Sequence, residues 1–190
     1  MPYTMEERYQ LIREAVMESR SVDPVAVVQE AMRRDFVSIH GPEHHFLDGA
    51  AFLVAFRNAG GKIDLGPALD ELAARALKMP GAMCGFWGMC GSTASVGAAL
   101  AIIDGTGPLS QDESYKEHME YTSSVIKRMS IIGGPRCCKR NAFLSLSSAV
   151  EFANKRYGVP MKCSPITCEF SPYNPTCLKE ACPFFSKKGI

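Results

Sequence analysis

The chain has 190 residues, of which 46% are hydrophobic, and 21 Lys and Arg against 20 Asp and Glu give a formal net charge of +1. A chain of this length can bury a real core as one domain, and the near-balance of charge argues against a surface built to neutralise nucleic-acid phosphates. No apolar run approaches the roughly 20 residues of a membrane span, and charged residues interrupt the first twenty positions, where a secretory signal would be apolar. These features predict a cytoplasmic protein that uses neither a membrane nor nucleic acid as its partner.

Helical periodicity dominates the first three quarters of the chain. Residues 5–18 carry apolar side chains at helical spacing, and Asp23 followed by Pro24 is a typical N-cap and first helical residue. Residues 46–56 are apolar enough for a central, buried helix. Further helices are predicted over 65–78, 93–104, 111–129 and 140–157. Because no stretch shows sustained alternation, the sequence predicts an all-α, mainly helical single domain over residues 1–190.

The character of the sequence changes after Gly158. Five prolines break any helix between residues 159 and 190, and four cysteines are interleaved with them. We therefore expect residues 159–190 to be an irregular, metal-binding tail within the same domain. If this tail is ordered, a metal is the simplest agent to hold it.

All eight cysteines follow residue 83 and fall in three loops. They are Cys84 and Cys90; Cys137 and Cys138; and Cys163, Cys168, Cys177 and Cys182. In a reducing compartment, clustered cysteines bind metals or react more often than they form disulfides. The alternative is that they are buried thiols acting as small hydrophobic residues.

The tail gives the strongest metal signal. Eight residues separate Cys168 from Cys177 and four separate Cys177 from Cys182, whereas zinc modules usually bring ligands in pairs about two to four residues apart. A proline follows Cys182, as it follows the last cysteine of one iron–sulfur motif. The tail therefore predicts three ligands of an iron–sulfur cluster, most simply 4Fe-4S, with zinc as the alternative metal.

The fourth ligand is expected from the loop GGPRCCKR at residues 133–140. Cys137 and Cys138 lie where a helix is predicted to begin, so free amides and the helix dipole favour negative charge there. Arg136, Lys139 and Arg140 add three cations that would lower the thiol pKa and stabilise an anionic cofactor. Because adjacent side chains diverge, one cysteine is expected to complete the cluster and the other to bind a second metal atom or react. One core thiol beside one exposed thiol is the alternative interpretation.

Four residues are candidates for catalysis beside the cluster. Cys84 and Cys90 lie in a glycine-rich loop, and Cys90 shortly precedes a predicted helix that Ser92 or Thr93 could cap. His44 and His45 could act as acid, base or metal ligand. The alternatives are a turn with packed cysteines and histidines that are buried or capping.

At these loops the sequence resembles an uncharacterised cysteine-rich family of methanogenic archaea and other strict anaerobes, some members of which are joined to methyltransferase-like domains. The matching stretches are HGPEHHF at 40–46, CGFWGMCG at 84–91, GGPRCCKR at 133–140 and the tail from 168 to 185. The resemblance implies an oxygen-free setting and a possible larger enzyme or methyltransferase partner, and it sets Cys163 apart. The stretch after Gly88 is also faintly similar to the helical domain of iron–sulfur serine dehydratases and cysteine desulfidases.

Three functions follow from this sequence. The first is an iron–sulfur protein of anaerobic metabolism, whose cluster and nearby thiols serve small-molecule or sulfur chemistry. The second is a zinc-stabilised module that docks onto another protein, and the third is a metal-free thiol or sulfur carrier. Whether the protein is an enzyme, and its oligomeric state, are left open by the sequence.

Overall fold

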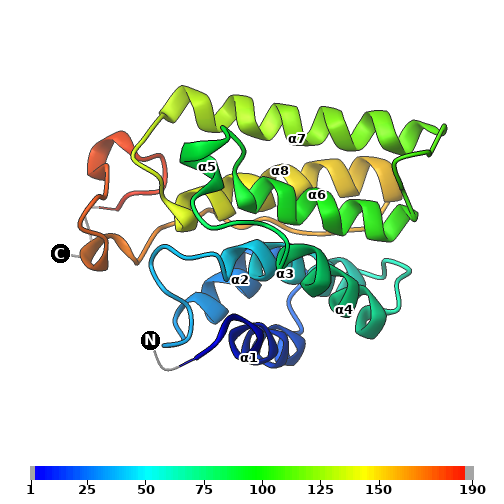
Figure 1. The fold of residues 1–190 in the computed structure, drawn as a ribbon, viewed down its shortest axis with the longest axis horizontal. Coiled ribbons are helices and arrows are strands. Elements are labelled where there is room, and N and C mark those ends of the chain that lie inside the picture. The colour runs from blue at the N-terminus through cyan, green and yellow to red at the C-terminus, as the bar shows by residue number, and fades with distance from the viewer. Residues whose placement is uncertain (1–2, 187–190) are drawn as a thin grey trace.

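The computed structural model describes residues 3–186 (Figure 1). Over this range it contains eight α-helices and two short 3-10 helices, and its only β-structure is an isolated bridge between Cys168 and Phe185. The helices are α1 (Met5–Glu18), α2 (Pro24–Met32), α3 (His44–Asn58), α4 (Leu65–Ala76), α5 (Met83–Phe86), α6 (Gly91–Asp104), α7 (Glu113–Ile132), α8 (Cys138–Tyr157), η1 (Ser171–Tyr173) and η2 (Lys179–Ala181). The predicted all-α class is confirmed.

Helix α3 is the centre of the core. Every residue from His44 to Phe56 is buried, and α3 packs against α1, α2, α4, α6 and α8. Phe46, Phe52 and Phe56 are among its largest buried side chains, and burying one such side chain stabilises the fold by about 1.5–3 kcal/mol. The prediction of a central buried helix is therefore confirmed.

The helix ends follow from local chemistry. Thr4 and Glu7 form a capping box at α1, and Asp23 accepts hydrogen bonds from the amides of Val25 and Ala26 at α2. Gly158 ends α8 in the left-handed conformation that glycine adopts without steric cost. One capping prediction is wrong: Cys90 is the N-cap residue of α6, and the Ser92 hydroxyl instead donates to Asn141 O at 3.3 Å and Ser145 Oγ at 3.0 Å.

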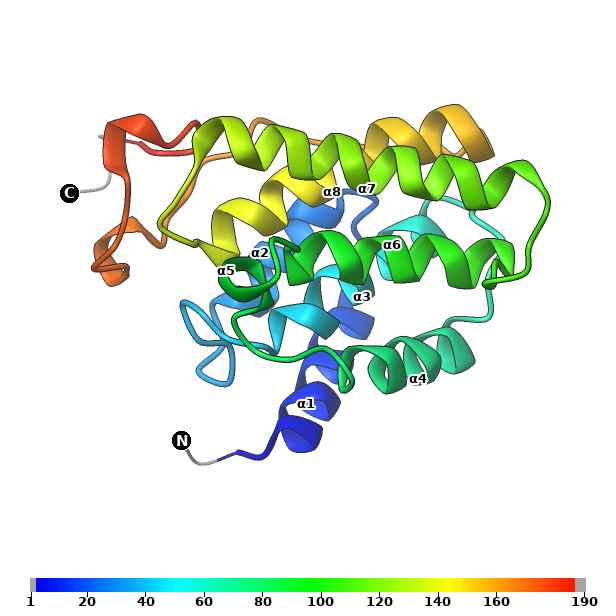
Figure 2. The same cartoon turned by 45° about the horizontal axis from the view of Figure 1, so that its top comes forward.

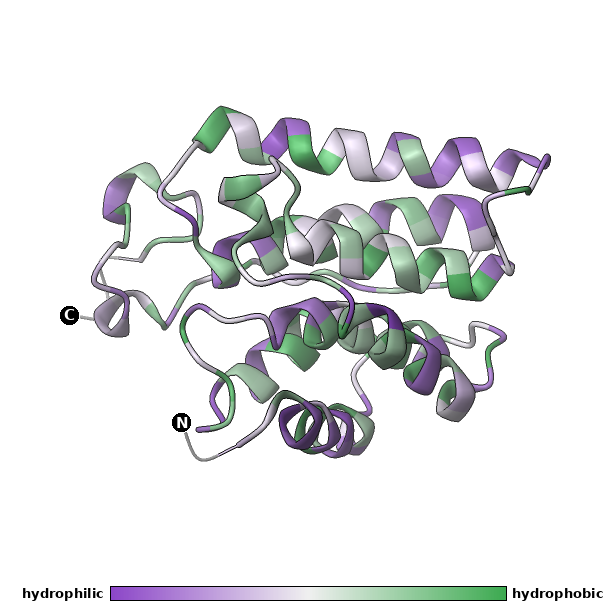
Figure 3. Ribbon diagram, viewed as in Figure 1, coloured by the Kyte–Doolittle hydropathy of each residue, from purple (hydrophilic) through white to green (hydrophobic). Residues whose placement is uncertain are grey.

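The helices form two layers. In Figure 1, α6, α7 and α8 lie above α1 to α4, and Figure 2 shows the same layers after rotation. Hydrophilic residues recur along α7 at the upper edge (Figure 3). The segments that carry the cysteines, namely α5, the start of α8 and the C-terminal segment, lie at the same end of this helical body (Figures 1 and 2).

The C-terminal segment is ordered through residue 186 by contacts within the protein. Glu169 forms a forked ion pair with Arg33, the C-cap residue of α2, with Arg33 nitrogens 2.8 and 3.0 Å from Glu169 Oε1. Phe170 is buried in the core, and the ring of Phe184 packs edge-on against Phe143 of α8, with centroids 5.4 Å apart. These contacts attach the segment to the helical body at three points along its length.

Within residues 3–186, no helix combines the length and the hydropathy that crossing a bilayer requires.

Candidate metal centre

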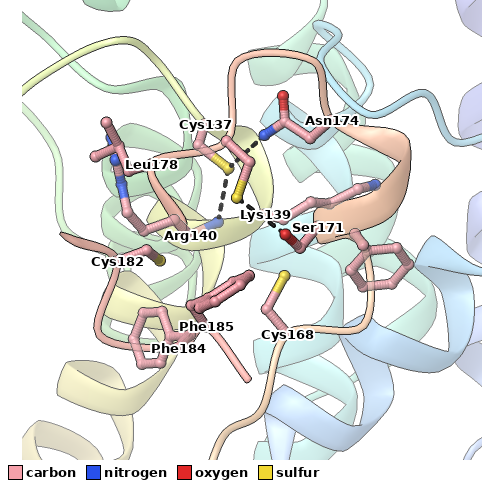
Figure 4. A pocket seen from close by; sticks show the side chains of 12 residues that line it. Cys137, Lys139, Arg140, Cys168, Ser171, Asn174, Leu178, Cys182, Phe184 and Phe185 are labelled. Atoms are coloured by element: carbon pink, nitrogen blue, oxygen red, sulfur yellow. Dashed lines mark hydrogen bonds between the residues drawn. The ribbon is translucent and has the colours of Figure 1, made fainter. Parts of the chain in front are cut away.

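Four cysteines surround one pocket at the cysteine-rich end of the molecule. The pocket encloses about 420 Å³, partly open to solvent, and Cys137, Cys168, Cys177 and Cys182 all line it. We call it the four-thiol pocket. Figure 4 shows the sulfur atoms of Cys137, Cys168 and Cys182 turned toward the shared space, with Phe184 and Phe185 along one side. The structure thus brings together the three tail cysteines and one member of the adjacent pair.

Cys137 reaches this pocket from the start of α8. It is the N-cap residue, and its Sγ accepts a hydrogen bond from the Arg140 amide at 3.4 Å. Asn174 Nδ2, from the C-terminal segment, also donates to this sulfur at 3.7 Å (Figure 4). Both donors, and the N-terminal end of the 20-residue helix α8, direct partial positive charge at this sulfur.

The tail sulfurs are also approached by hydrogen-bond donors. The Lys179 amide donates to Cys177 Sγ at 3.4 Å, and Ser171 Oγ lies 3.2 Å from the same sulfur. Burial raises the pKa of Cys168 and of Cys182, while a hydrogen bond to the backbone of Phe170 or Phe184 partly offsets that effect. The Cys168 and Cys182 thiols are therefore protonated at neutral pH, and a metal ion would displace their protons.

Two of the three predicted cations lie inside this site. Lys139 and Arg140 line the four-thiol pocket and are almost fully buried, whereas Arg136 is exposed and borders the neighbouring pockets. Lys139 Nζ donates to Ser38 O at 2.9 Å and lies 5.0 Å from the ring centre of Phe170. Burial lowers the pKa of Lys139 to about 8. Two of the three cationic residues of the loop therefore line the same pocket as the thiols.

A second pocket collects three of the remaining thiols. Cys84, Cys90 and Cys138 line a space of about 410 Å³, which we call the three-thiol pocket, and Cys137 borders it as well. Cys84 and Cys90 were expected to face the cluster of the tail, but neither lines the four-thiol pocket. Their partner is Cys138, so the adjacent pair is divided between two sites. Cys163 lines neither pocket and is exposed.

Burial overturns one expectation for this second group. The sequence predicts lowered thiol pKa values near the two helix starts, but burial raises the pKa of Cys138 to about 12 and also raises the pKa of Cys90. Desolvation of the thiolate outweighs the nearby amides and cations at these positions.

The two histidines differ in their surroundings. His44 Nδ1 lies 3.2 Å from Asp48 Oδ1, and its Nε2 lies 3.3 Å from Lys139 Nζ, so both nitrogens are satisfied. His45 is 7% exposed, and its Nδ1 has no hydrogen-bond partner. Both rings line the three-thiol pocket. Adjacent side chains on a helix point about 100° apart, yet both histidines are buried.

Sequence reasoning missed the polar side chains that support the cysteines. Asn174 contacts Cys137, and Asn141 Nδ2 donates to Cys90 Sγ at 3.3 Å. His40 lies between the two pockets, since its Nδ1 accepts from the Cys138 amide at 3.4 Å and its Nε2 lies 3.1 Å from Asn174 Oδ1. Asn141 directly follows the GGPRCCKR stretch and His40 opens the HGPEHHF stretch, but the sequence does not indicate which sulfur or amide each side chain contacts.

As they stand, the His, Cys, Asp and Glu side chains of residues 3–186 include no group of three close enough to hold a single ion. The four-thiol pocket is instead a set of sulfurs distributed around a space.

Comparison with known proteins identifies the family but no activity. No curated protein and no solved structure matches the chain. A family model described as a family of unknown function, DUF5714, matches residues 12–185, which include both thiol pockets and all eight cysteines. The chain therefore belongs to the DUF5714 family.

Proposed function

We propose that this protein binds an iron–sulfur cluster in the four-thiol pocket, with Cys137, Cys168, Cys177 and Cys182 as its ligands. The observation that carries the proposal is the convergence of these four cysteines, from two segments far apart in sequence, on one pocket. Four cysteine thiolates are the usual ligand set of a 4Fe-4S cluster.

The surroundings of the pocket suit an anionic cluster. Amide groups approach its sulfurs at the start of α8 and in the C-terminal segment, and hydrogen bonds to sulfur help to set the potential of a cluster. Lys139 and Arg140 supply positive charge, while Phe170, Phe184 and Phe185 provide an apolar wall. Such a wall limits the access of water and oxygen to iron and sulfide.

The spacing of the ligands supports a cluster over zinc. Most zinc modules bring their ligands in close pairs, about two to four residues apart. Here eight residues separate Cys168 from Cys177, four separate Cys177 from Cys182, and Cys137 comes from the start of α8. Cys168 therefore has no partner at the spacing of a zinc pair.

The proposal places the protein in an oxygen-free, reducing setting, in keeping with an anaerobic role. With four cysteine ligands, the cluster in this pocket would transfer electrons or stabilise the C-terminal segment. Small-molecule or sulfur chemistry would then belong to the neighbouring thiols Cys84, Cys90 and Cys138.

The test is metal analysis of protein purified without oxygen. We expect iron and acid-labile sulfide in equal amounts, with broad absorption in the visible range. Cys168→Ser and Cys177→Ser should each remove the iron, sulfide and absorption of one cluster, about four iron atoms per chain. Cys163→Ser is the matched control, because Cys163 is exposed and lines neither pocket.

Two outcomes would overturn the proposal. A colourless protein that carries zinc would identify a zinc-stabilised interaction module, in which loss of zinc releases the C-terminal segment. A protein without metal, whose Cys168→Ser variant behaves like the parent, would identify a thiol carrier.

A further inference from the structure

The three-thiol pocket is built by two segments that are remote in sequence. Cys84 of the short helix α5 and Cys90 at the start of α6 come from one of them, and Cys138 in the first turn of α8 comes from the other. All three line the same pocket, and none of them lines the four-thiol pocket, although Cys137 borders both. Packing of the helix ends does not require three cysteines in one pocket, because alanine would also fill each of these positions.

Hydrogen-bond donors already point at two of these sulfurs. Asn141 Nδ2 lies 3.3 Å from Cys90 Sγ, and the backbone amides of Ser92 and Thr93 act on the same sulfur from the first turn of α6. The backbone of Gly41 acts in the same way on Cys138. These groups would compensate the charge of thiolates once a metal had displaced their protons.

A buried imidazole supplies a fourth donor atom. His45 lines the pocket, its ring hydrogen-bonds to the backbone of Met79, and its Nδ1 is buried without a partner. Buried polar atoms are nearly always satisfied, so an orphaned ring nitrogen calls for an explanation. Metal-ligating histidines commonly bond to a backbone group through one nitrogen and to the metal through the other, which is the arrangement available to His45.

We propose that Cys84, Cys90, Cys138 and His45 form a second iron–sulfur site, independent of the cluster proposed for the four-thiol pocket. The cysteines hold three irons through thiolates, and His45 holds the fourth. The inference extends the proposed cluster chemistry to a second set of residues, but either site can be loaded without the other.

This second site adjoins a wide cleft. Cys84, Cys90, Arg136 and Asn141 line both the three-thiol pocket and a neighbouring space of about 760 Å³ that is open to solvent. Glycines form much of the cleft wall, and Arg136 is an exposed cation at its edge. A small anion could therefore approach the irons held by Cys84 and Cys90, which line both spaces.

The experiment is an iron and sulfide count on protein purified without oxygen. The parent should carry about twice the iron of one 4Fe-4S cluster. The Cys168→Ser/Cys177→Ser double variant should retain half of the parent's iron and sulfide, and adding Cys84→Ser or Cys138→Ser to it should remove the rest. Cys163→Ser is again the control. Far-ultraviolet circular dichroism identifies variants that fold, and partly exposed Cys84 offers a less disruptive change than the more deeply buried Cys138.

The counts separate the two proposals. If Cys84→Ser and Cys138→Ser fold and keep all the iron and sulfide of the parent, the second site is overturned and the first stands. If the Cys168→Ser/Cys177→Ser variant keeps all of its iron and Cys84→Ser removes it, the first site is overturned and the second stands.

The role of His45 has its own readout. Mild oxidation with ferricyanide converts a 4Fe-4S cluster with a weakly held iron into a three-iron cluster, with release of one Fe²⁺ and transfer of one electron to ferricyanide. His45→Ala added to the Cys168→Ser/Cys177→Ser variant should make the second cluster undergo this conversion faster than in that variant alone, as detected by electron paramagnetic resonance. Equal rates in the double variant with and without His45→Ala would remove His45 from the ligand set.

Discussion

The imidazole of His45 lies directly against the backbone of Gly91. A methyl group added at Gly91 would lie 2.2 Å from both Cδ2 and Nε2 of the ring. This close approach joins the first turn of α3 to the first turn of α6, immediately after Cys90. The glycine therefore fixes the distance between a buried histidine and a cysteine of the three-thiol pocket.

Gly91→Ala should destabilise the protein by about 1–3 kcal/mol, because the new methyl group forces the ring or the helix to move in a packed interior. Urea or thermal unfolding measures the loss. Gly85→Ala is the control, since nothing lies within 4 Å of a methyl group added there, and it should change stability by less than about 0.5 kcal/mol. Equal effects of the two substitutions would show that the contact with His45 is unimportant.

Asn174→Ala should loosen the C-terminal segment. The Asn174 side chain contacts Cys137 Sγ and His40 Nε2 and accepts a hydrogen bond from the Thr176 amide at 3.0 Å. Loss of these buried contacts should cost about 1–3 kcal/mol and increase cleavage of this segment in limited proteolysis. Tyr173→Ala, at a neighbouring exposed position, should cleave at the parental rate. Unchanged proteolysis of Asn174→Ala would contradict the anchoring role.

Asp104→Ala should weaken the fold without changing the metal content. Asp104 Oδ2 lies 2.9 Å from His118 Nε2 and accepts hydrogen bonds at 3.0 Å from Arg156 Nε and Tyr157 Oη, which links the end of α6 to α7 and α8. Removing this shared acceptor should cost about 2–4 kcal/mol. Calorimetry measures the loss, and metal analysis checks that iron is retained. Glu113→Ala, which breaks an exposed pair with Lys116, should leave both unchanged.

Glu43 should contribute to stability in a pH-dependent way. Burial acts to raise the pKa of Glu43, but hydrogen bonds from backbone amides, including that of Ser38, and the nearby His44 lower it from its ordinary value of 4.5. A carboxyl group with a lowered folded-state pKa stabilises the protein above its unfolded pKa, and this contribution is lost as the pH falls through the folded-state value. Glu43→Gln should therefore be less stable than the parent near pH 7, by about 1–3 kcal/mol.

That difference between parent and Glu43→Gln should shrink steadily below pH 4.5. Chelator-treated, reduced protein is the sample for both variants, so that loss of metal in acid does not enter the comparison. A difference that stays constant between pH 7 and pH 3 would contradict the assignment.

The fold was largely predictable because its signals are local. Helical spacing placed six α-helices to within three residues of both ends, and the cap Asp23 placed the start of α2. The four-residue helix α5 was missed, because so short an element has no periodicity to read. The role of Ser92 was also wrong, since its hydroxyl finds partners on α8 that no local pattern encodes.

The sequence indicated which cysteines belong to the candidate site, but not how they are divided between the two pockets. Spacing correctly grouped Cys168, Cys177 and Cys182, which lie in one short segment. It could not assign Cys84 and Cys90 to Cys138, because that grouping depends on how α5, α6 and α8 meet. Nor could it give the raised pKa of Cys138, since burial is a property of the assembled core.

Cys137 and Cys138 are joined by a single peptide bond, yet only Cys137 lines the four-thiol pocket. In the two proposals above, this bond joins ligands of two metal sites, which is the shortest covalent connection that a polypeptide can provide. A change in the backbone at the first turn of α8 would therefore reach both pockets at once.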